Sequence, residues 1–373
     1  MSNGKVSKNV RWKKRLLELL LAVLIAVVGW LYPELMEEPV TEPTPTAEVV
    51  QTVTPNPKPV SGKLQVTMFN VGQADCFLVQ QGENAILVDT ATSGEIDAVI
   101  KRLQEMGITK LVAVVFTHPH DDHMGGAAKF IAHFGKNVRV IYMPDYTLSM
   151  GTQRWQTNME LEILRRSNME EEYIAQYEKW EEECSNLSEK EQELYLTQKT
   201  DQFFVENCDV VHPKPKDVIQ LGEATIQFIA PSSQKYSNVN NYSICFRLTF
   251  GDVSMLFTGD AEVLSEKEML ELGVELKSDI LKVGHHGSNT SSSQEFLDAV
   301  SPQYVMISCE MGHKDENPDK EVVDRLEKGG YEVYRTDECG EVTMTTDGKT
   351  IKWSCEPGDY LSGIELAKGA DAK

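Results

Sequence analysis

The spacing of apolar and polar residues after residue 62 predicts strands and a helix in turn. Residues 63–70 and 76–81 alternate, as half-buried strands do, whereas 84–90 and 111–117 are almost continuous apolar runs typical of buried strands. Between these two runs, residues 94–106 place apolar side chains at helical spacing. This order of strand, helix and strand predicts a parallel pair joined by a helical crossover, and hence an α/β fold.

Strand patterns continue through the second half of the chain. A hairpin is predicted over 243–258 with its turn at Gly251-Asp252, and a second hairpin turns at Asp347-Gly348. The remaining predicted strands lie at 138–143, 218–221, 224–229, 279–284 and 303–309. We therefore expect one globular domain over residues 63–355, followed by a flexible tail at 356–373 that has few core-forming residues.

Residues 154–206 look like an insertion into this domain. They hold 14 acidic and 6 basic residues, a net charge of −8 from 6 minus 14, and form two helix-like halves. Ser188 and Glu191 have the spacing of a capping box that opens the second half. The insertion is expected to be a solvated helical hairpin; a coiled-coil partner site and a lid over an active site are the alternatives.

The N-terminal part of the chain is typical of a membrane anchor. Residues 1–15 carry six basic and no acidic side chains, and 16–32 are apolar apart from Glu18. A helix of that length spans about 25 Å, which is close to the thickness of a bilayer core. The basic flank predicts a single uncleaved span with its N-terminus inside, against a cleaved signal peptide or a buried helix. The proline-rich residues 33–62 would then tether the globular domain outside the cell membrane.

Charge and cysteine content narrow the function classes. The net charge of −22 argues against a broad nucleic-acid-binding surface, although it leaves room for a local basic groove. The seven cysteines form no CxxC pair, so a cysteine zinc site is not supported. Cys339 and Cys355 flank the second hairpin, and a disulfide between them is a hypothesis for an exported domain.

The densest chemistry lies in "FTHPHDDHMGG", residues 116–126, directly after a buried strand. His118 and His120 are two apart in extended chain, so their imidazoles point the same way. Asp122 and His123 follow where a helix is expected to begin. Four potential ligands within six residues at the end of a strand favour a metal site over an ordinary polar turn.

Three other predicted strands also end on residues that can bind metal. Asp260 ends one apolar strand, and His285 and His286 end another. Taken singly, Asp260 is a candidate helix cap and either histidine a structural hydrogen bonder. Asp89 ends a third strand, where it would either orient a ligand histidine or cap the next loop. The repeated layout favours a two-ion site.

These motifs resemble the metallo-β-lactamase superfamily of binuclear hydrolases. More narrowly, "FNVGQADCFLV", "THPHDDHMGG" and "DILKVGHHGS" are similar to the metallo-hydrolase domain of the ComEC family of competence DNA-uptake proteins. The resemblance covers about residues 63–352, apart from the insertion. It implies a four-layer αββα sandwich for the 63–355 domain, here as a stand-alone relative without the channel and oligonucleotide-binding-like domains of that family.

The resemblance also implies how two divalent ions, Zn or Mn, would be held. His118 and His120 would bind the first ion, Asp122 and His123 the second, and Asp260 would bridge them. His285 would complete the second site, and His286 would contact substrate or donate a proton. The residues implied to be catalytic are therefore Asp122, Asp260 and His286.

One expected ligand is missing. The superfamily has a further histidine between the first motif and the bridging aspartate, where this chain has "NVNNYS" at 238–243. Asn240, Asn241 or water are the candidates to complete the first site, with His133 and His212 as alternatives. Ser288 would bind substrate oxygens or cap its loop.

The implied activity is hydrolysis by a metal-bound hydroxide. By resemblance the leading substrate is a phosphodiester or nucleic-acid-like molecule, so the chain would be a phosphodiesterase or nuclease. A β-lactamase or thioesterase would use the same metals on a different electrophile. A non-enzymatic binding module with a structural metal is the third hypothesis, although six or seven ligands exceed what such a metal needs.

Overall fold

A computed structural model of the 373-residue chain describes residues 62–134, 137–145, 170–207, 210–232 and 236–371. The predicted basic segment, the membrane anchor at 16–32 and the linker up to residue 61 lie outside these residues. Within the described ranges, no helix combines the length and the apolar character needed to cross a bilayer.

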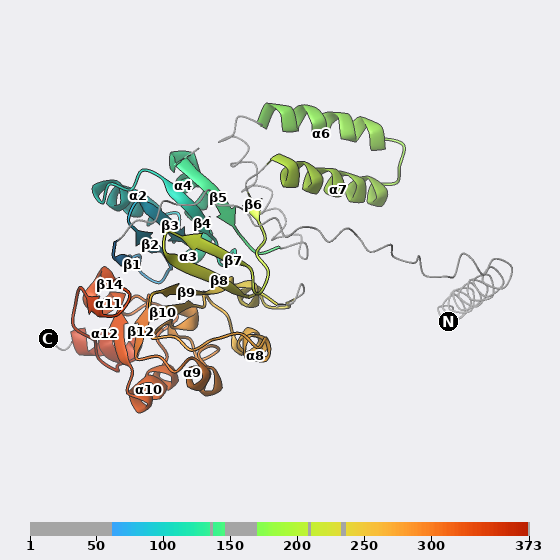
Figure 1. The fold of residues 1–373 in the computed structure, drawn as a ribbon. Helices are drawn as coiled ribbons and strands as arrows, with labels where there is room; N and C mark the ends of the chain where they lie inside the picture. The colour runs from blue at the N-terminus through green and yellow to red at the C-terminus, as the bar shows by residue number, and fades with distance from the viewer. Residues whose placement is uncertain (1–61, 135–136, 146–169, 208–209, 233–235, 372–373) are drawn as a thin grey trace, which may run out of the picture. The chain divides into compact units, whose positions relative to one another are not determined.

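Two β-sheets form the centre of the described domain (Figure 1). The first sheet has the order β15-β14-β1-β2-β3-β4-β5-β6, and the second has the order β13-β12-β11-β10-β9-β8-β7. The strands of the first sheet are β1 (Leu64–Met68), β2 (Phe77–Gln81), β3 (Asn84–Val88), β4 (Leu111–Val115), β5 (Val138–Tyr142), β6 (Val210–Val211), β14 (Val342–Thr346) and β15 (Ile351–Trp353). Those of the second are β7 (Val218–Leu221), β8 (Ala224–Ala230), β9 (Cys245–Phe250), β10 (Val253–Phe257), β11 (Ile280–Lys282), β12 (Tyr304–Ile307) and β13 (Glu332–Arg335).

Helices cover the outer faces of the two sheets. The helices are α2 (Ile96–Glu105), α3 (Asp121–Met124), α4 (Ala127–Phe134), α6 (Glu170–Cys184), α7 (Glu189–Asn207), α8 (Val263–Glu271), α9 (Gln294–Val300), α10 (Lys320–Gly329), α11 (Thr336–Cys339) and α12 (Gly363–Asp371), with 3-10 turns η3 (Val239–Tyr242) and η4 (Gly284–Gly287). Helices α2 and α4 pack on the first sheet, and α8, α9 and α10 pack on the second.

Alternation along the strands explains this layering. In β2, Phe77 and Val79 face the second sheet, while Leu78 packs towards α2 and α4. Phe77 meets Phe257 of the second sheet edge to face, with ring centroids 5.6 Å apart. Since each sheet has two apolar faces, one is buried against the other sheet and one under helices. The predicted αββα sandwich is therefore confirmed.

The predicted local connections are also present. Strands β3 and β4 pair in parallel through the α2 crossover, and β9 and β10 form the first predicted hairpin. Gly251 in its turn has φ +60°, and a Cβ there would lie 2.6 Å from the carbonyl oxygen of Gly348. Only glycine fits where the turns of the two hairpins meet.

The described part of the insertion is helical, as predicted. Helices α6 and α7 lie side by side (Figure 1), with the ring of Phe203 5.4 Å from Tyr173 and 6.2 Å from Trp180. Residues 154–169 lie outside the described part, so a role as a lid stays a prediction. Ser188 and Glu191 form the expected capping contact at the start of α7.

The C-terminal segment differs from the predicted flexible tail. Residues 363–371 form α12, which begins where Gly363 N donates to Pro318 O at 3.0 Å. The buried Arg335 donates to Leu361 O, and Tyr360 OH donates to Tyr331 O at 2.7 Å. These bonds, with Tyr360 packed against the core beside them, hold the segment on the domain.

The strand order gathers the polar strand ends at one edge. Asp89 follows β3, His118 follows β4, Asp260 follows β10, and His286 follows β11. These strands leave the two facing sheets in the same region, so residues far apart in sequence converge there.

Candidate metal centre

The first histidine-rich segment turns sharply after β4. His120 is extended, with φ −69° and ψ 152°, and α3 begins at the next residue. Gly126 lies so close to Thr90 O and Ile96 that a Cβ there would collide with both. The segment can therefore fold back against β3 and α2 only with glycine at position 126. His118 and His123, which precede this glycine, are both buried.

The second histidine pair lies on a strained turn. His285 and His286 have φ values of 51° and 53°, in the left-handed region that non-glycine residues rarely adopt. Each such residue costs on the order of 1–3 kcal/mol, and such strain clusters at functional sites. His285 N donates to Gly259 O at 3.1 Å, and Gly284 N donates to Ser292 Oγ at 3.1 Å, which hold the turn beside Asp260.

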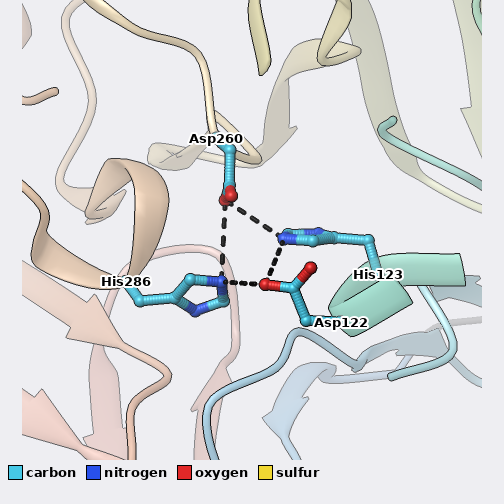
Figure 2. Close-up of side chains that lie close together, drawn as sticks. All are labelled: Asp122, His123, Asp260 and His286. Atoms are coloured by element: carbon cyan, nitrogen blue, oxygen red, sulfur yellow. Dashed lines mark hydrogen bonds and ion pairs between the residues drawn. The ribbon is translucent and has the colours of Figure 1, made fainter. Parts of the chain in front are cut away.

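Four ligand-type side chains converge in one cluster, Asp122, His123, Asp260 and His286 (Figure 2). Nε2 of His123 lies 3.2 Å from Asp260 Oδ1. Nε2 of His286 lies 3.2 Å from Asp122 Oδ2 and 3.8 Å from Asp260 Oδ1. These side chains come from three different segments, since Asp122 and His123 are neighbours in α3, and they point towards a common centre.

A second cluster shares Asp260 and contains His118 and His120. Nε2 of His118 lies 3.7 Å from Asp260 Oδ2 and 3.0 Å from Nδ1 of His120. Asp260 therefore turns one oxygen to each cluster, as a bridging carboxylate would.

The structure corrects the predicted division of the histidine pair. His286, not His285, lies with Asp122 and His123. Nε2 of His285 lies 3.6 Å from Asp260 Oδ2, the same oxygen that faces His118. The His285 ring therefore faces Oδ2 of Asp260 and the His286 ring faces Oδ1, a division that sequence spacing does not reveal.

The ligand histidines are oriented by neighbouring groups. Asp89 Oδ2 lies 2.8 Å from Nδ1 of His123, and its two oxygens also accept from Thr117 N and Oγ1, each at 2.7 Å. Of its two predicted roles, Asp89 therefore has the orienting one. Nδ1 of His286 donates to Ser308 O at 2.9 Å, which leaves Nε2 directed into the cluster.

The asparagines that stand in the place of the missing histidine form hydrogen bonds with residues at the start of α8. Asn241 Oδ1 accepts from the backbone N–H groups of Glu262 and Ser265 at 3.3 and 3.2 Å, at the start of α8. Asn240 Nδ2 donates to Glu262 Oε1 at 3.2 Å. Both asparagines are buried, and Oδ1 of Asn240 lacks a hydrogen-bond partner within the described residues.

The other candidates lie outside the two clusters. His133 contacts Gln104 at 3.0 Å, and His212 contacts Met143 O at 2.9 Å. Ser288 Oγ lies 3.3 Å from Oγ1 of Thr290, which in turn lies 3.1 Å from Nδ1 of His285. Thr290, which the sequence did not single out, is thus the hydroxyl that contacts this histidine.

Burial and neighbouring charges shift the pKa values of the ligand side chains in opposite directions. Burial and the charge of His123 hold the pKa of His118 well below its usual value. Burial opposes charge on His123 and His286 too, but nearby carboxylates, Asp260 foremost, raise the pKa of each imidazole. The pKa of Asp122 and that of Asp260 are lowered despite burial, by the histidines beside them.

The donors fit divalent ions. Both oxygens of Asp260 and Nε2 of His123 are buried and lack a hydrogen-bond partner in the part of the chain that the structure describes. A buried polar atom without a partner costs free energy, so three that face one another indicate a missing common partner. Imidazole nitrogens and carboxylate oxygens are ligands that suit zinc and manganese.

Two further residues beneath the site were missed from the sequence. Lys282 and Asp75 are almost completely buried, and their Nζ and Oδ2 atoms lie 2.9 Å apart. The signal was a lysine within the otherwise apolar run "DILKV", which requires a buried partner.

Comparison with known proteins agrees with this geometry. The sequence model of the metallo-beta-lactamase superfamily matches residues 69–313, more than half of the chain. ComE operon protein 3 of Bacillus subtilis is 24% identical over 326 residues, which cover 82% of this chain and 36% of that protein. Recombination protein 2 of Haemophilus influenzae is 26% identical over 287 residues, covering 75% and 28%.

Competence protein ComA of Neisseria gonorrhoeae is 37% identical over 115 residues, which cover 31% of this chain and 17% of that protein. The chain thus spans about a third or less of the length of these relatives. The two ligand clusters and the two-sheet fold both lie mainly within the matched region. The chain belongs to the metallo-beta-lactamase superfamily of metal-dependent hydrolases, and its relatives are ComEC-like competence proteins.

Proposed function

We propose that this chain is a binuclear metal-dependent hydrolase that cleaves phosphodiester bonds. The observation that carries the proposal is the position of Asp260, whose Oδ1 faces His123 and whose Oδ2 faces His118. A structural metal needs one closed set of four ligands, whereas two clusters that share a carboxylate are the arrangement of a catalytic pair.

The first ion would be held by His118, His120 and Asp260, with His285 in the place of the missing histidine. The 3.6 Å between Nε2 of His285 and Asp260 Oδ2 supports this assignment. The second ion would be held by Asp122, His123, Asp260 and His286. Zinc and manganese both suit this mixture of nitrogen and oxygen donors.

The chain's own residues would arrange the reaction around these ions. Two bound divalent ions lower the pKa of a shared water and stabilise negative charge on substrate oxygens. Asp89 and Ser308 O fix the rings of His123 and His286, so that Nε2 of each stays directed at the centre. His120 is exposed and His285 half-buried, so substrate would approach from their side of the site.

A phosphodiester is the favoured substrate class because the relatives include proteins named for competence and recombination, which are processes that act on DNA. The acidic charge of −22 favours small or single-stranded substrates over an extended duplex. Residues 16–32 would anchor the chain in the cell membrane with the catalytic domain outside.

The test is hydrolysis of bis-p-nitrophenyl phosphate and single-stranded DNA by chain that has been stripped and reloaded with manganese or zinc. We expect turnover that requires added metal and that Asp260→Asn lowers at least 10³-fold. Turnover of nitrocefin or a thioester alone would instead support the β-lactamase or thioesterase alternative. Two bound ions without turnover of any substrate would support the binding module.

A further inference from the structure

Lys282 occupies an unusual place for a lysine. It ends β11, three residues before His285, and only 1% of its surface is exposed. Burying an ammonium costs several kcal/mol unless it is paired and hydrogen-bonded. Its Nζ lies 2.9 Å from Asp75 Oδ2, donates to Val283 O at 2.9 Å and lies 3.5 Å from Gly259 O. The ammonium therefore has three protein partners.

Two of these partners belong to segments that carry a metal-site ligand, and the third is hydrogen-bonded to such a segment. Gly259 directly precedes Asp260, and Val283 leads into the turn that holds His286. Asp75 reaches the third segment, because its backbone N–H donates to Asp122 O at 3.0 Å. The lysine thus joins, through one charged group, the three segments that carry the cluster of Asp122, His123, Asp260 and His286.

Asp75 also approaches the ligand histidines themselves. Its Oδ1 is buried without a hydrogen-bond partner in the described residues and lies 3.6 Å from Nδ1 of His286. Its Oδ2 lies 3.9 Å from Nδ1 of His123. A carboxylate here places negative charge behind both rings, on the side opposite the metal-facing nitrogens, where it strengthens them as ligands.

We propose that Asp75 and Lys282 form a positioning pair that sets the second metal site before metal arrives. The pair touches no substrate and is not catalytic; its role rests on the two-ion site proposed above. The negative charge of Asp75 acts on His123 and His286, and Lys282 holds Asp75 in place while compensating that charge within the buried region.

The test is a stepwise titration of metal-free chain with manganese and with zinc. Calorimetry measures the affinity of each ion, and the metal content per chain gives the number bound. The variants are Asp75→Asn, which keeps the shape, and Lys282→Met/Asp75→Asn, which removes both charges. Asp122→Asn marks the loss of the second site. Arg335→Met/Asp337→Asn removes another buried ion pair, with a 2.7 Å contact that involves no ligand, and serves as the matched control.

We expect both Asp75 variants to bind the second ion about 10–100-fold more weakly and the first ion within about threefold of wild type. The control should keep both affinities. Unchanged affinity for the second ion in either folded variant would overturn the proposal. So would a failure of both to fold even in saturating manganese, since the fold rather than the site would then need the pair. A wild-type chain that binds fewer than two ions would instead refute the two-ion site itself.

Discussion

Nδ1 of His123 lies 2.8 Å from Oδ2 of Asp89, and both side chains are buried. Because Asp89 also accepts two bonds from Thr117, it holds the ring with Nε2 towards Asp260. We expect Asp89→Asn to weaken binding of the second ion about 10–100-fold while the chain stays folded. Competition with a chelator of known affinity, alongside circular dichroism, checks this.

Thr117→Val tests the same interaction by a milder change than Asp89→Asn. It removes the Oγ1 contact with Asp89 at 2.7 Å and the weaker Oγ1 contacts with Nδ1 of His118 and His123 at 3.2 and 3.3 Å, and it keeps the backbone donor to Asp89. A smaller loss of affinity than in Asp89→Asn is expected. Equal affinities in wild type and both variants would show that Asp89 does not orient the ring.

The two adjacent histidines should differ in which ion they hold. His285→Ala should lower affinity for the first ion, because its Nε2 faces the same Asp260 oxygen as His118. His286→Ala should lower affinity for the second, where it contacts Asp122. Cobalt substitution, with absorption spectra of each variant, distinguishes the two sites. Loss of the same ion in both variants would contradict the assignment.

Protons and metal should compete for the site. In the metal-free chain the pKa of His123 and that of His286 are raised, chiefly by Asp260 against the effect of burial. The stability these two contribute is therefore fully present below about pH 6.5, their unfolded pKa, and is lost as pH rises through the folded values. Bound metal must displace these protons, so its affinity increases with pH.

Thermal unfolding with and without manganese at pH 6 and pH 8 measures this competition. The metal-induced rise in Tm should be larger at pH 8. The opposite order would show that the histidines are not protonated in the metal-free chain or do not bind the ion.

Cys339 and Cys355 offer a stability test outside the site. Both are free, and burial, with a smaller effect of the Cys339 thiol, raises the pKa of Cys355 to about 12. Oxidised glutathione should link them by thiol–disulfide exchange and add about 3 kcal/mol to the free energy of unfolding, given the loop of roughly 15 residues. Non-reducing mass spectrometry detects the link, and Cys339→Ser should abolish it. Thiols that stay free after oxidation would contradict this.

The sequence allowed the layers and most of the site to be predicted because the relevant signals are local. Strand ends marked by Asp89, His118 and Asp260 follow apolar runs, and parallel strands bring such ends together. The hairpin turns at Gly251 and Gly348 are also local signals.

The remaining features of the site and the fold depend on three-dimensional geometry that the spacing of apolar and polar residues does not predict. His285 and His286 face different oxygens of Asp260 from a turn in which both have left-handed φ values. Asp75 and Lys282 meet only because the two sheets pack face to face. The segment around α12 is attached through backbone carbonyls, the buried Arg335 and the single side chain of Tyr360, which form no periodic apolar pattern.

The proposed binuclear site depends most directly on Asp260 as a carboxylate shared by two ions. Metal content per chain, measured by mass spectrometry on reconstituted wild type and Asp260→Asn after removal of loosely bound metal, tests it. We expect two ions per wild-type chain and fewer than one in the variant, because both clusters lose a common ligand. Two ions retained by Asp260→Asn, or a single ion in wild type, would contradict the binuclear site.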